Sequence, residues 1–210
     1  MPFNPFDPEF KDLPEMIPIF PLSGALLLPR GELPLNIFEP RYLAMVADCL
    51  QGNRLIGIIQ PNFTTGCVGR IVKFEEVIDG RYLISLRGIC RFHIGQDNTS
   101  PMTPYRVAHV LWDGFQEDMV RTPALNIDKC HFKTVLKQYL ESQGLSMDWD
   151  LIDEVAEEGL VTSLAMICPL DSRDKQALLE AKCAKTRAAL FIKLLEMSVR
   201  LEGDGLTTSH

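Results

Sequence analysis

The 210-residue chain has no surplus of basic residues, no long apolar run and no recognisable export signal. Its 21 Lys and Arg are outnumbered by 28 Asp and Glu, and the resulting net charge of −7 disfavours bulk attraction to nucleic acid or anionic membranes. Residues 1–15 lack the basic and apolar segments of a signal peptide, and no stretch approaches the ~20 apolar residues of a membrane span. We therefore expect a cytoplasmic protein without a membrane partner.

Paired cysteine spacing is also missing. The six cysteines are scattered, which is typical of reduced thiols rather than of a disulfide framework or a zinc site. Cys130 and His131 are adjacent and suggest a metal site or an activated thiolate. Neighbours on a predicted helix point about 100° apart, however, so two ligands to one metal would be awkward. We favour a structural role for this pair and expect neither a metal nor a cofactor.

Signatures of catalysis are scarce as well. Ser23 and Ser163 lie among apolar residues, but neither stands in the Gly-x-Ser-x-Gly turn that exposes a nucleophile. The acidic run between residues 148 and 158 misses the calcium-loop spacing, and carboxylates near a helix start are favoured by the helix dipole alone. We expect a solvated helix face there and no enzymatic activity.

The N-terminal half carries strand signals. After a proline-containing arm, apolar runs at 17–20, 25–28 and 33–38 are each cut by Pro or Gly, as in the short strands of a small barrel. Further strands are predicted at 54–60, 69–78, 81–94 and 105–112. Asp79-Gly80 is the strongest hairpin signal, and Gly88 predicts a bulge where the sheet curls. One helix, from Pro40 to Gly52, interrupts the strands.

Beyond Gly114 the apolar spacing becomes helical. We predict helices from 124 to 144, from a cap at Asp148 or Asp150 to Gly159, over 160–167, from a cap at Asp171 or Ser172, and over 186–201. The fold class is α+β, a β-rich part followed by a helical bundle. The domain boundaries predicted are an extended arm at 1–15, a β-rich subdomain at 16–115, a helical subdomain at 120–203 and a flexible tail at 204–210.

Residues 17–42 carry a family resemblance. The run opens Ile17-Pro-Ile-Phe-Pro-Leu and ends Phe38-Glu-Pro-Arg-Tyr42, and it resembles the opening of the Lon protease N-terminal, substrate-binding domain. Similar segments recur at 66–71, 79–84, 87–92, 105–108, 164–170 and 175–179, so the resemblance covers about residues 15–200. It implies a PUA-like pseudo-barrel followed by a helical bundle, acting in substrate recognition.

The chain lacks the Gly-x-x-x-x-Gly-Lys-[Ser/Thr] loop that cradles ATP phosphates, and few residues follow position 203. The resemblance thus implies a free-standing Lon-type domain without the motor and peptidase domains. We expect a non-enzymatic module that engages unfolded or client polypeptides in proteolysis or quality control, with a separate protease as a candidate partner. Two alternatives stay open: an RNA-binding PUA-like module using Arg81, Arg87, Arg91 and Arg106, and a hydrolase with a site between the two subdomains.

Apolar side chains near Pro and Gly breaks are the candidates for a peptide-binding surface, where an extended segment adds as a strand or docks a side chain. They are Leu26, Leu27, Leu28, Leu35 and Phe63. The motif Phe38, Glu39, Pro40, Arg41 and Tyr42 is either part of that surface or a folding junction. We favour the junction, with both aromatic rings packed and the Glu and Arg side chains either paired or capping the helix.

Overall fold

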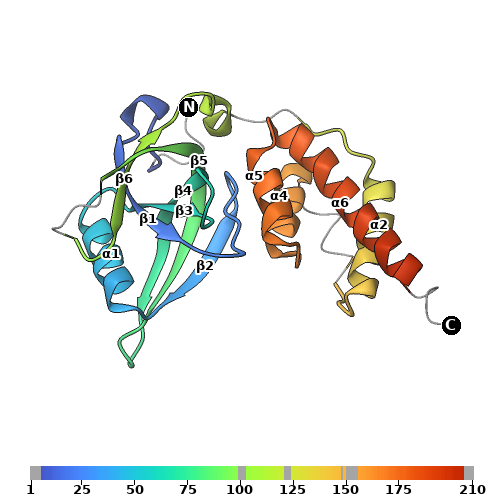
Figure 1. Cartoon of the computed structure of the whole chain (residues 1–210), viewed down its shortest axis with the longest axis horizontal. Helices are drawn as coiled ribbons and strands as arrows, with labels where there is room; N and C mark the ends of the chain where they lie inside the picture. The colour runs from blue at the N-terminus through green and yellow to red at the C-terminus, as the bar shows by residue number, and fades with distance from the viewer. Residues whose placement is uncertain (1–5, 99–102, 121–123, 148, 150–155, 206–210) are drawn as a thin grey trace.

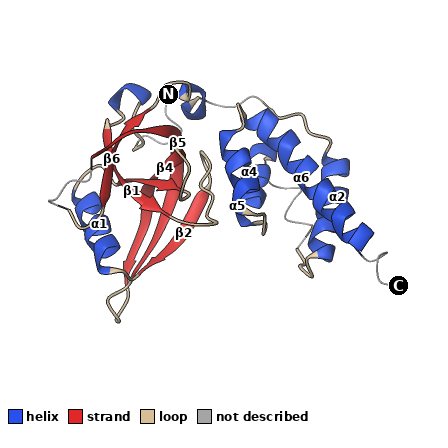
Figure 2. Ribbon diagram, in the orientation of Figure 1, coloured by secondary structure: helices blue, strands red, loops and turns tan. Residues whose placement is uncertain are grey.

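The computed structural model of the protein describes residues 6–98, 103–120, 124–147, 149 and 156–205. Figure 1 shows a curled sheet built from the N-terminal half beside a group of helices built from the C-terminal half, and Figure 2 shows the same division by secondary structure. The α+β fold class is therefore confirmed. Among the described helices, none is both long enough and apolar enough to cross a membrane.

The sheet has six strands in the order β2-β5-β4-β3-β1-β6. They are β1 (Met16–Pro21), β2 (Glu32–Ile37), β3 (Leu55–Ile59), β4 (Thr65–Glu76), β5 (Tyr82–Asn98) and β6 (Arg106–Leu111). The far end of β5 also pairs with β6, so five of the strands close into a barrel. Strand β2 is left outside this closure, paired with the first residues of β5.

The hairpin of β4 and β5 is confirmed. Gly80 in the turn has a φ of +81°, a backbone conformation that residues with a Cβ rarely adopt. The bulge expected near Gly88 is also present, since the β4 to β5 register shifts between Val68 and Gly69. Gly88 exchanges backbone hydrogen bonds with the 30–31 turn, and a Cβ at this position would collide with the Leu28 carbonyl. The bulge thus brings the chain before β2 onto β5.

Helix α1 (Pro40–Gln51) starts at Pro40 as predicted and is followed by Gly52. Proline suits the first helical position because its missing N–H would have no partner inside the helix. The helix buries one face, formed by Tyr42, Met45, Val46 and Cys49. Its start is therefore fixed directly at the end of β2, and the strand and the helix meet at a sharp junction.

The strand predicted at residues 25–28 is wrong. This segment is irregular, although Leu26, Leu27 and Leu28 are almost completely buried. Their side chains join the apolar cluster that also contains residues of α1 and of the helices. A short apolar run signals burial without distinguishing a strand from a loop that packs into a core.

The C-terminal half contains α2 (Lys129–Ser142), α4 (Glu157–Ile167), α5 (Ser172–Glu180) and α6 (Ala184–Gly205). Helix α2 begins later than position 124, at a cap whose Asp128 carboxylate accepts from the His131 N–H, and Gly144 follows it with a φ of +66°. The end predicted at Gly159 is wrong because α4 continues through that residue. The caps proposed at Asp148 and Asp150 lie outside the described residues.

The Asp171 cap of α5 is confirmed, since its carboxylate accepts from the Asp174 N–H. Helix α6 is longer at both ends than the predicted 186–201 and occupies two residues assigned to the tail, 204 and 205. The rest of that predicted tail, 206–210, is outside the described residues. Buried side chains of α2, α4, α5 and α6 pack into one cluster with α1 and the 26–28 segment. The barrel has a second, internal cluster around Ile17, Val68 and Phe92.

Polar contacts join α5 to the barrel. Gln176 donates to the Thr65 carbonyl at 3.2 Å, and Gln60 donates to the Ser172 carbonyl at 2.9 Å. Both glutamines are buried, so these bonds are shielded from water. Lys175 adds a bond to the Gly24 carbonyl at 2.8 Å. The helical part is therefore held against the sheet by specific contacts as well as by apolar packing.

The described part of the N-terminal arm lies on the barrel. Asp7 pairs with Arg87 at 2.5 Å, and Leu13 is buried in the internal cluster of the barrel. The Trp112 indole donates to the Pro14 carbonyl at 3.1 Å. Residues 1–5 of the predicted arm are outside the described residues.

Candidate functional site

A hollow of about 250 Å³ lies where β2 meets α1. Leu35, Phe38, Glu39 and Arg41 line it beside Tyr42. The Tyr42 ring is buried against Phe20, with ring centroids 4.1 Å apart. This burial raises the pKa of the Tyr42 hydroxyl, because an ionised phenolate would lose hydration there. The hollow therefore has a packed aromatic base and a partly polar wall.

The Phe38 side chain borders this hollow and is exposed to solvent. Its exposed fraction is 64 %, so the prediction that Phe38 packs into the fold is wrong, whereas Tyr42 is buried as predicted. Ile37 ends β2 with its side chain in the core, and the direction of side chains alternates along a strand. The next residue consequently faces outward.

The pairing predicted for Glu39 and Arg41 is confirmed. Arg41 Nη2 lies 2.8 Å from Glu39 Oε2, and the Arg41 guanidinium also lies over the Tyr42 ring, 4.6 Å from its centroid. Both charged side chains are well exposed to solvent, so the pair contributes little to stability. The pair does, however, help to keep the Arg41 guanidinium over the Tyr42 ring at the hollow.

The structure brings only part of the predicted peptide-binding set to this place. Leu35 is half-buried and lines the hollow beside Phe38. Phe63 is half-buried but lies in the turn between β3 and β4, away from the lining residues. Leu26, Leu27 and Leu28 are at most 2 % exposed, so they cannot contact a peptide in this conformation. Their role here is to fill the core.

Strand β2 borders the hollow, and the way its backbone is paired also bears on peptide binding. Among the described strands it pairs with β5 alone, which leaves its other edge without a ladder partner. An edge strand offers unpaired backbone N–H and C=O groups to another extended chain. Pro34, in the middle of β2, is exposed and has no N–H to offer, a common feature of strands at sheet edges.

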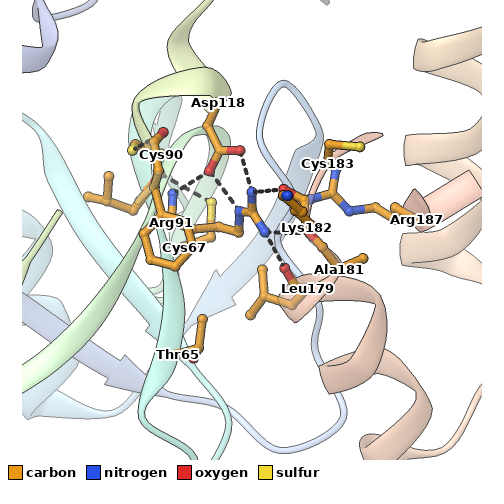
Figure 3. Close-up of polar contacts among 12 residues, drawn as sticks. Thr65, Cys67, Cys90, Arg91, Asp118, Leu179, Ala181, Lys182, Cys183 and Arg187 are labelled. Carbon is orange, nitrogen blue, oxygen red and sulfur yellow. Dashed lines mark hydrogen bonds and ion pairs between the residues drawn. The ribbon is translucent and has the colours of Figure 1, made fainter. Parts of the chain in front are cut away.

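A larger cavity of about 440 Å³ lies between the barrel and the helical part. On the barrel side it is lined by Arg91 of β5 and by Asp118 of the short helix η2 (Gln116–Met119), and on the other side by the start of α6. Figure 3 shows Arg91 between Asp118 and the carbonyl groups at the C-terminal end of α5 and in the residues just after it. The cavity is where the two halves of the chain meet.

Arg91 is the central side chain of this region. It is 2 % exposed and donates through Nε and Nη2 to the two Asp118 oxygens, both at 2.8 Å. Its Nη1 donates to the carbonyls of Leu179 and Ala181 at 3.0 and 2.7 Å. Burial alone would lower the Arg91 pKa, but the Asp118 carboxylate outweighs it and the pKa is raised. Arg91 thus links β5, η2 and α5 through charge-assisted hydrogen bonds.

One thiol borders the same cavity. Cys183 precedes α6, and its pKa is lowered by hydrogen bonds from the Thr186 hydroxyl and from backbone N–H groups. The thiols of Cys67 and Cys90 are different, because burial raises their pKa. No histidine is among the described residues that line the cavity. The described lining of the cavity therefore offers a thiol without a neighbouring imidazole base.

Three of the four arginines of the RNA alternative are engaged in ion pairs. Arg81 pairs with Asp79 at 2.7 Å, and Arg87 pairs with the arm at Asp7. Arg91 is buried in the contact with Asp118, which removes it from the surface. The fourth, Arg106 of β6, is half-buried. A binding surface for a phosphate backbone needs accessible positive charge, and the acidic partners offset the charge of the three paired arginines.

The side chains of the adjacent residues Cys130 and His131 leave α2 in different directions. His131 Nε2 lies 2.9 Å from Glu196 of α6, so the imidazole joins two helices, and Cys130 is exposed. In the part of the chain that the structure describes, no group of three His, Cys, Asp or Glu side chains is placed to hold a metal ion.

Comparison with known families places this architecture. The family model for the substrate-binding domain of the ATP-dependent protease La (LON) matches residues 16–197. The chain belongs to this LON substrate-binding domain family. The matched range contains both the hollow at the end of β2 and the larger cavity between the halves.

Individual relatives of this LON substrate-binding domain are distant in sequence. Lon protease 2 of Myxococcus xanthus is 25% identical over 202 residues, covering 88% of this chain and 24% of the relative. The Lon protease of Anaeromyxobacter dehalogenans is 24% identical over 200 residues, covering 88% of this chain and 23% of the relative. The chain thus spans about a quarter of the length of these curated relatives.

A solved structure supports the fold. The crystal structure of a Lon N-terminal domain protein from Xanthomonas campestris superposes with a TM-score of 0.59 at 23% identity. The match covers 86% of this chain and 97% of that one. The barrel followed by helices is therefore an arrangement that this LON substrate-binding domain shares with a solved relative.

Proposed function

We propose that the protein recognises extended segments of unfolded or client polypeptides at the edge of β2 and the adjoining hollow. The observation that carries this proposal is the exposed Phe38 ring beside that hollow. An exposed large apolar side chain next to a concave surface is a common feature of protein interaction sites. Membership of the LON substrate-binding domain family supports polypeptide as the ligand class.

The proposed mode of binding combines backbone pairing with side-chain docking. An extended client segment adds along the free edge of β2, which fixes its direction without demanding a particular sequence. One apolar client side chain then enters the hollow between Leu35 and Phe38, whose volume of about 250 Å³ suits a single residue. The exposed Arg41 and Glu39 lie at its wall and keep it accessible to water.

Binding of this kind needs no bond-making chemistry. In our proposal the protein captures client segments for proteolysis or quality control and acts with a separate protease rather than as an enzyme. The sequence supports this in one respect, because these 210 residues contain no phosphate-binding Gly-x-x-x-x-Gly-Lys-[Ser/Thr] loop.

The test is a titration with a fluorescently labelled, permanently unfolded polypeptide, followed by anisotropy. Phe38→Ser should weaken binding by at least about tenfold, because burying a phenylalanine ring contributes about 1.5–3 kcal/mol. Met197→Ser is the matched control, since Met197 is an exposed apolar residue of α6 far along the chain. Equal affinities of the wild type and Phe38→Ser would contradict the proposed site, and a complete lack of binding by the wild type would contradict the function.

A further inference from the structure

The cavity between the barrel and the helical part has an unbalanced charge. Arg91 and Asp118 line its barrel side together with Glu117 and with Arg30, which pairs with Glu158 of α4, and the segment from Lys182 to Arg187 forms the opposite wall. The lining thus carries five basic residues, Arg30, Arg91, Lys182, Lys185 and Arg187, against the two acidic residues Glu117 and Asp118. The Asp118 carboxylate accepts three hydrogen bonds from Arg91, through Nε, Nη2 and the backbone N–H. Asp118 and Arg91 therefore neutralise each other, and Arg187 makes no described hydrogen bond to this carboxylate.

Arg187 is that second guanidinium. Its exposed fraction is 5 %, its Nε donates to the Leu178 carbonyl at 2.9 Å, and its Nη2 has no hydrogen-bond partner among the described residues. Burial, and after it the neighbouring Arg91 charge, lower the Arg187 pKa to about 10. A buried charged donor without a partner has lost its hydration and gained no hydrogen bond in return, which is unfavourable in free energy. Such a group is a strong candidate for contact with an anionic ligand.

Other side chains of the cavity favour the same class of ligand. Lys182 and Lys185 are exposed and add positive charge where the cavity reaches solvent. Val120 and Leu125 supply apolar wall. Figure 3 shows the Arg187 side chain extending from α6 toward the barrel, close to Lys182 and the Arg91 pair. At about 440 Å³ the space is large enough for a terminal residue with its carboxylate.

We propose that this cavity binds a carboxylate-bearing polypeptide segment, with the carboxylate on Arg187 Nη2 and an adjoining apolar side chain against Val120 and Leu125. This inference rests on the proposed function, since it assigns a second contact to the same class of client. A carboxylate fits better than a bulkier dianion because the proposed contact rests on the single donor group Arg187 Nη2 and most of the exposed wall is apolar. The carboxylate comes from the C-terminus of a client or from an acidic side chain, and the two sources are separable by experiment.

The experiment measures the affinity of the whole protein for three labelled pentapeptides by fluorescence anisotropy. One ends in leucine with a free carboxylate, the second is its C-terminal amide, and the third is an amide with an internal aspartate. We expect the free acid to bind about tenfold or more tightly than its amide, as a charge-assisted hydrogen bond to a buried donor implies. Binding of the aspartate peptide equal to that of the free acid would identify the acidic side chain as a second source.

Two variants locate the contact. Arg187→Met keeps an unbranched apolar stem and should abolish the preference for the free acid. Lys182→Gln combined with Lys185→Gln alters only exposed positions and should weaken the free acid severalfold while flattening its salt dependence. Lys193→Gln, an exposed lysine elsewhere on α6, is the matched control and should change nothing.

Equal affinity for the free acid and the amide in the wild type would overturn the inference. A preference for the free acid that survives in Arg187→Met would also overturn it. The unfolded polypeptide titration with Phe38→Ser separates this failure from that of the proposed function. If that titration succeeds while the pentapeptides show no carboxylate preference, only the carboxylate site is refuted.

Discussion

Removing one partner of the buried contact between Arg91 and Asp118 should be among the most destabilising single changes in this fold. Both side chains are at most 9 % exposed, and Arg91 also binds the carbonyls of Leu179 and Ala181. Replacing Asp118 by Ala leaves a buried guanidinium without its counter-charge. The lost contact joins β5, η2 and the end of α5, so the change acts on the junction of the two halves.

The expected loss is about 3–5 kcal/mol, which is typical when one partner of a buried ion pair is removed. For a urea dependence of about 2 kcal/mol/M, the unfolding midpoint of Asp118→Ala should fall by roughly 2 M. The matched control is Asp79→Ala, because Asp79 and Arg81 form an ion pair with both side chains well exposed. This control should lose far less stability, because an exposed pair is screened by solvent.

Urea unfolding followed by circular dichroism measures both variants. A third variant, Arg91→Met with Asp118→Leu, removes both charges. It should recover most of the stability, since such buried sites often accept apolar residues of similar volume. A loss in Asp118→Ala no larger than that in Asp79→Ala would refute the reasoning. So would a double variant that is less stable than Asp118→Ala alone.

Three further predictions concern glycine packing and the thiols. Gly88→Ala should destabilise the fold by about 2 kcal/mol or more in the same urea assay, because its Cβ would collide with the Leu28 backbone carbonyl; a neutral effect would show that the bulge can move. Under native conditions iodoacetamide should label Cys183, whose pKa is lowered, well before Cys67 and Cys90, and mass spectrometry of the digests should find the two buried thiols unlabelled. Burial raises the pKa of those two thiols, so their contribution to stability is complete below the unfolded thiol pKa of about 8.5 and is lost as pH rises above it, when only the unfolded chain ionises. The urea midpoint under reducing conditions should therefore fall between pH 8 and pH 10, and an unchanged midpoint would contradict the assigned burial.

Local signals predicted the elements whose conformation is decided locally. The Asp79-Gly80 turn needs a positive φ that glycine provides, and Pro40 favours a helix start because its missing N–H has no partner in the first turn. The segment at 25–28 shows the limit of such reasoning. Its leucines are buried, but no strand pairs with them, and pairing partners are a property of the whole sheet. Gly159 shows the same limit, because packing of α4 against its neighbours outweighs the weak helix propensity of one glycine.

The candidate site was predictable in part. The motif at 38–42 marked the junction, and the pairing of Glu39 with Arg41 followed from their spacing. The exposure of Phe38 did not follow, since it depends on which face of β2 packs against the core, and that face holds Ile37. Arg91 gave one overlooked signal, a charged residue between Cys90 and Phe92 in an otherwise apolar stretch. The cavity that it borders depends on how the helices dock, which no local pattern contains.

The central claim is that client polypeptides bind along β2 and at the hollow beside Phe38. Hydrogen exchange with mass spectrometry tests it most directly, comparing the free protein with the protein saturated by an unfolded polypeptide. An added strand should slow exchange in β2 (Glu32–Ile37) and at the start of α1, and Phe38→Ser should remove this protection. Protection that appears only in α2 and α6, with β2 unchanged, would contradict the claim.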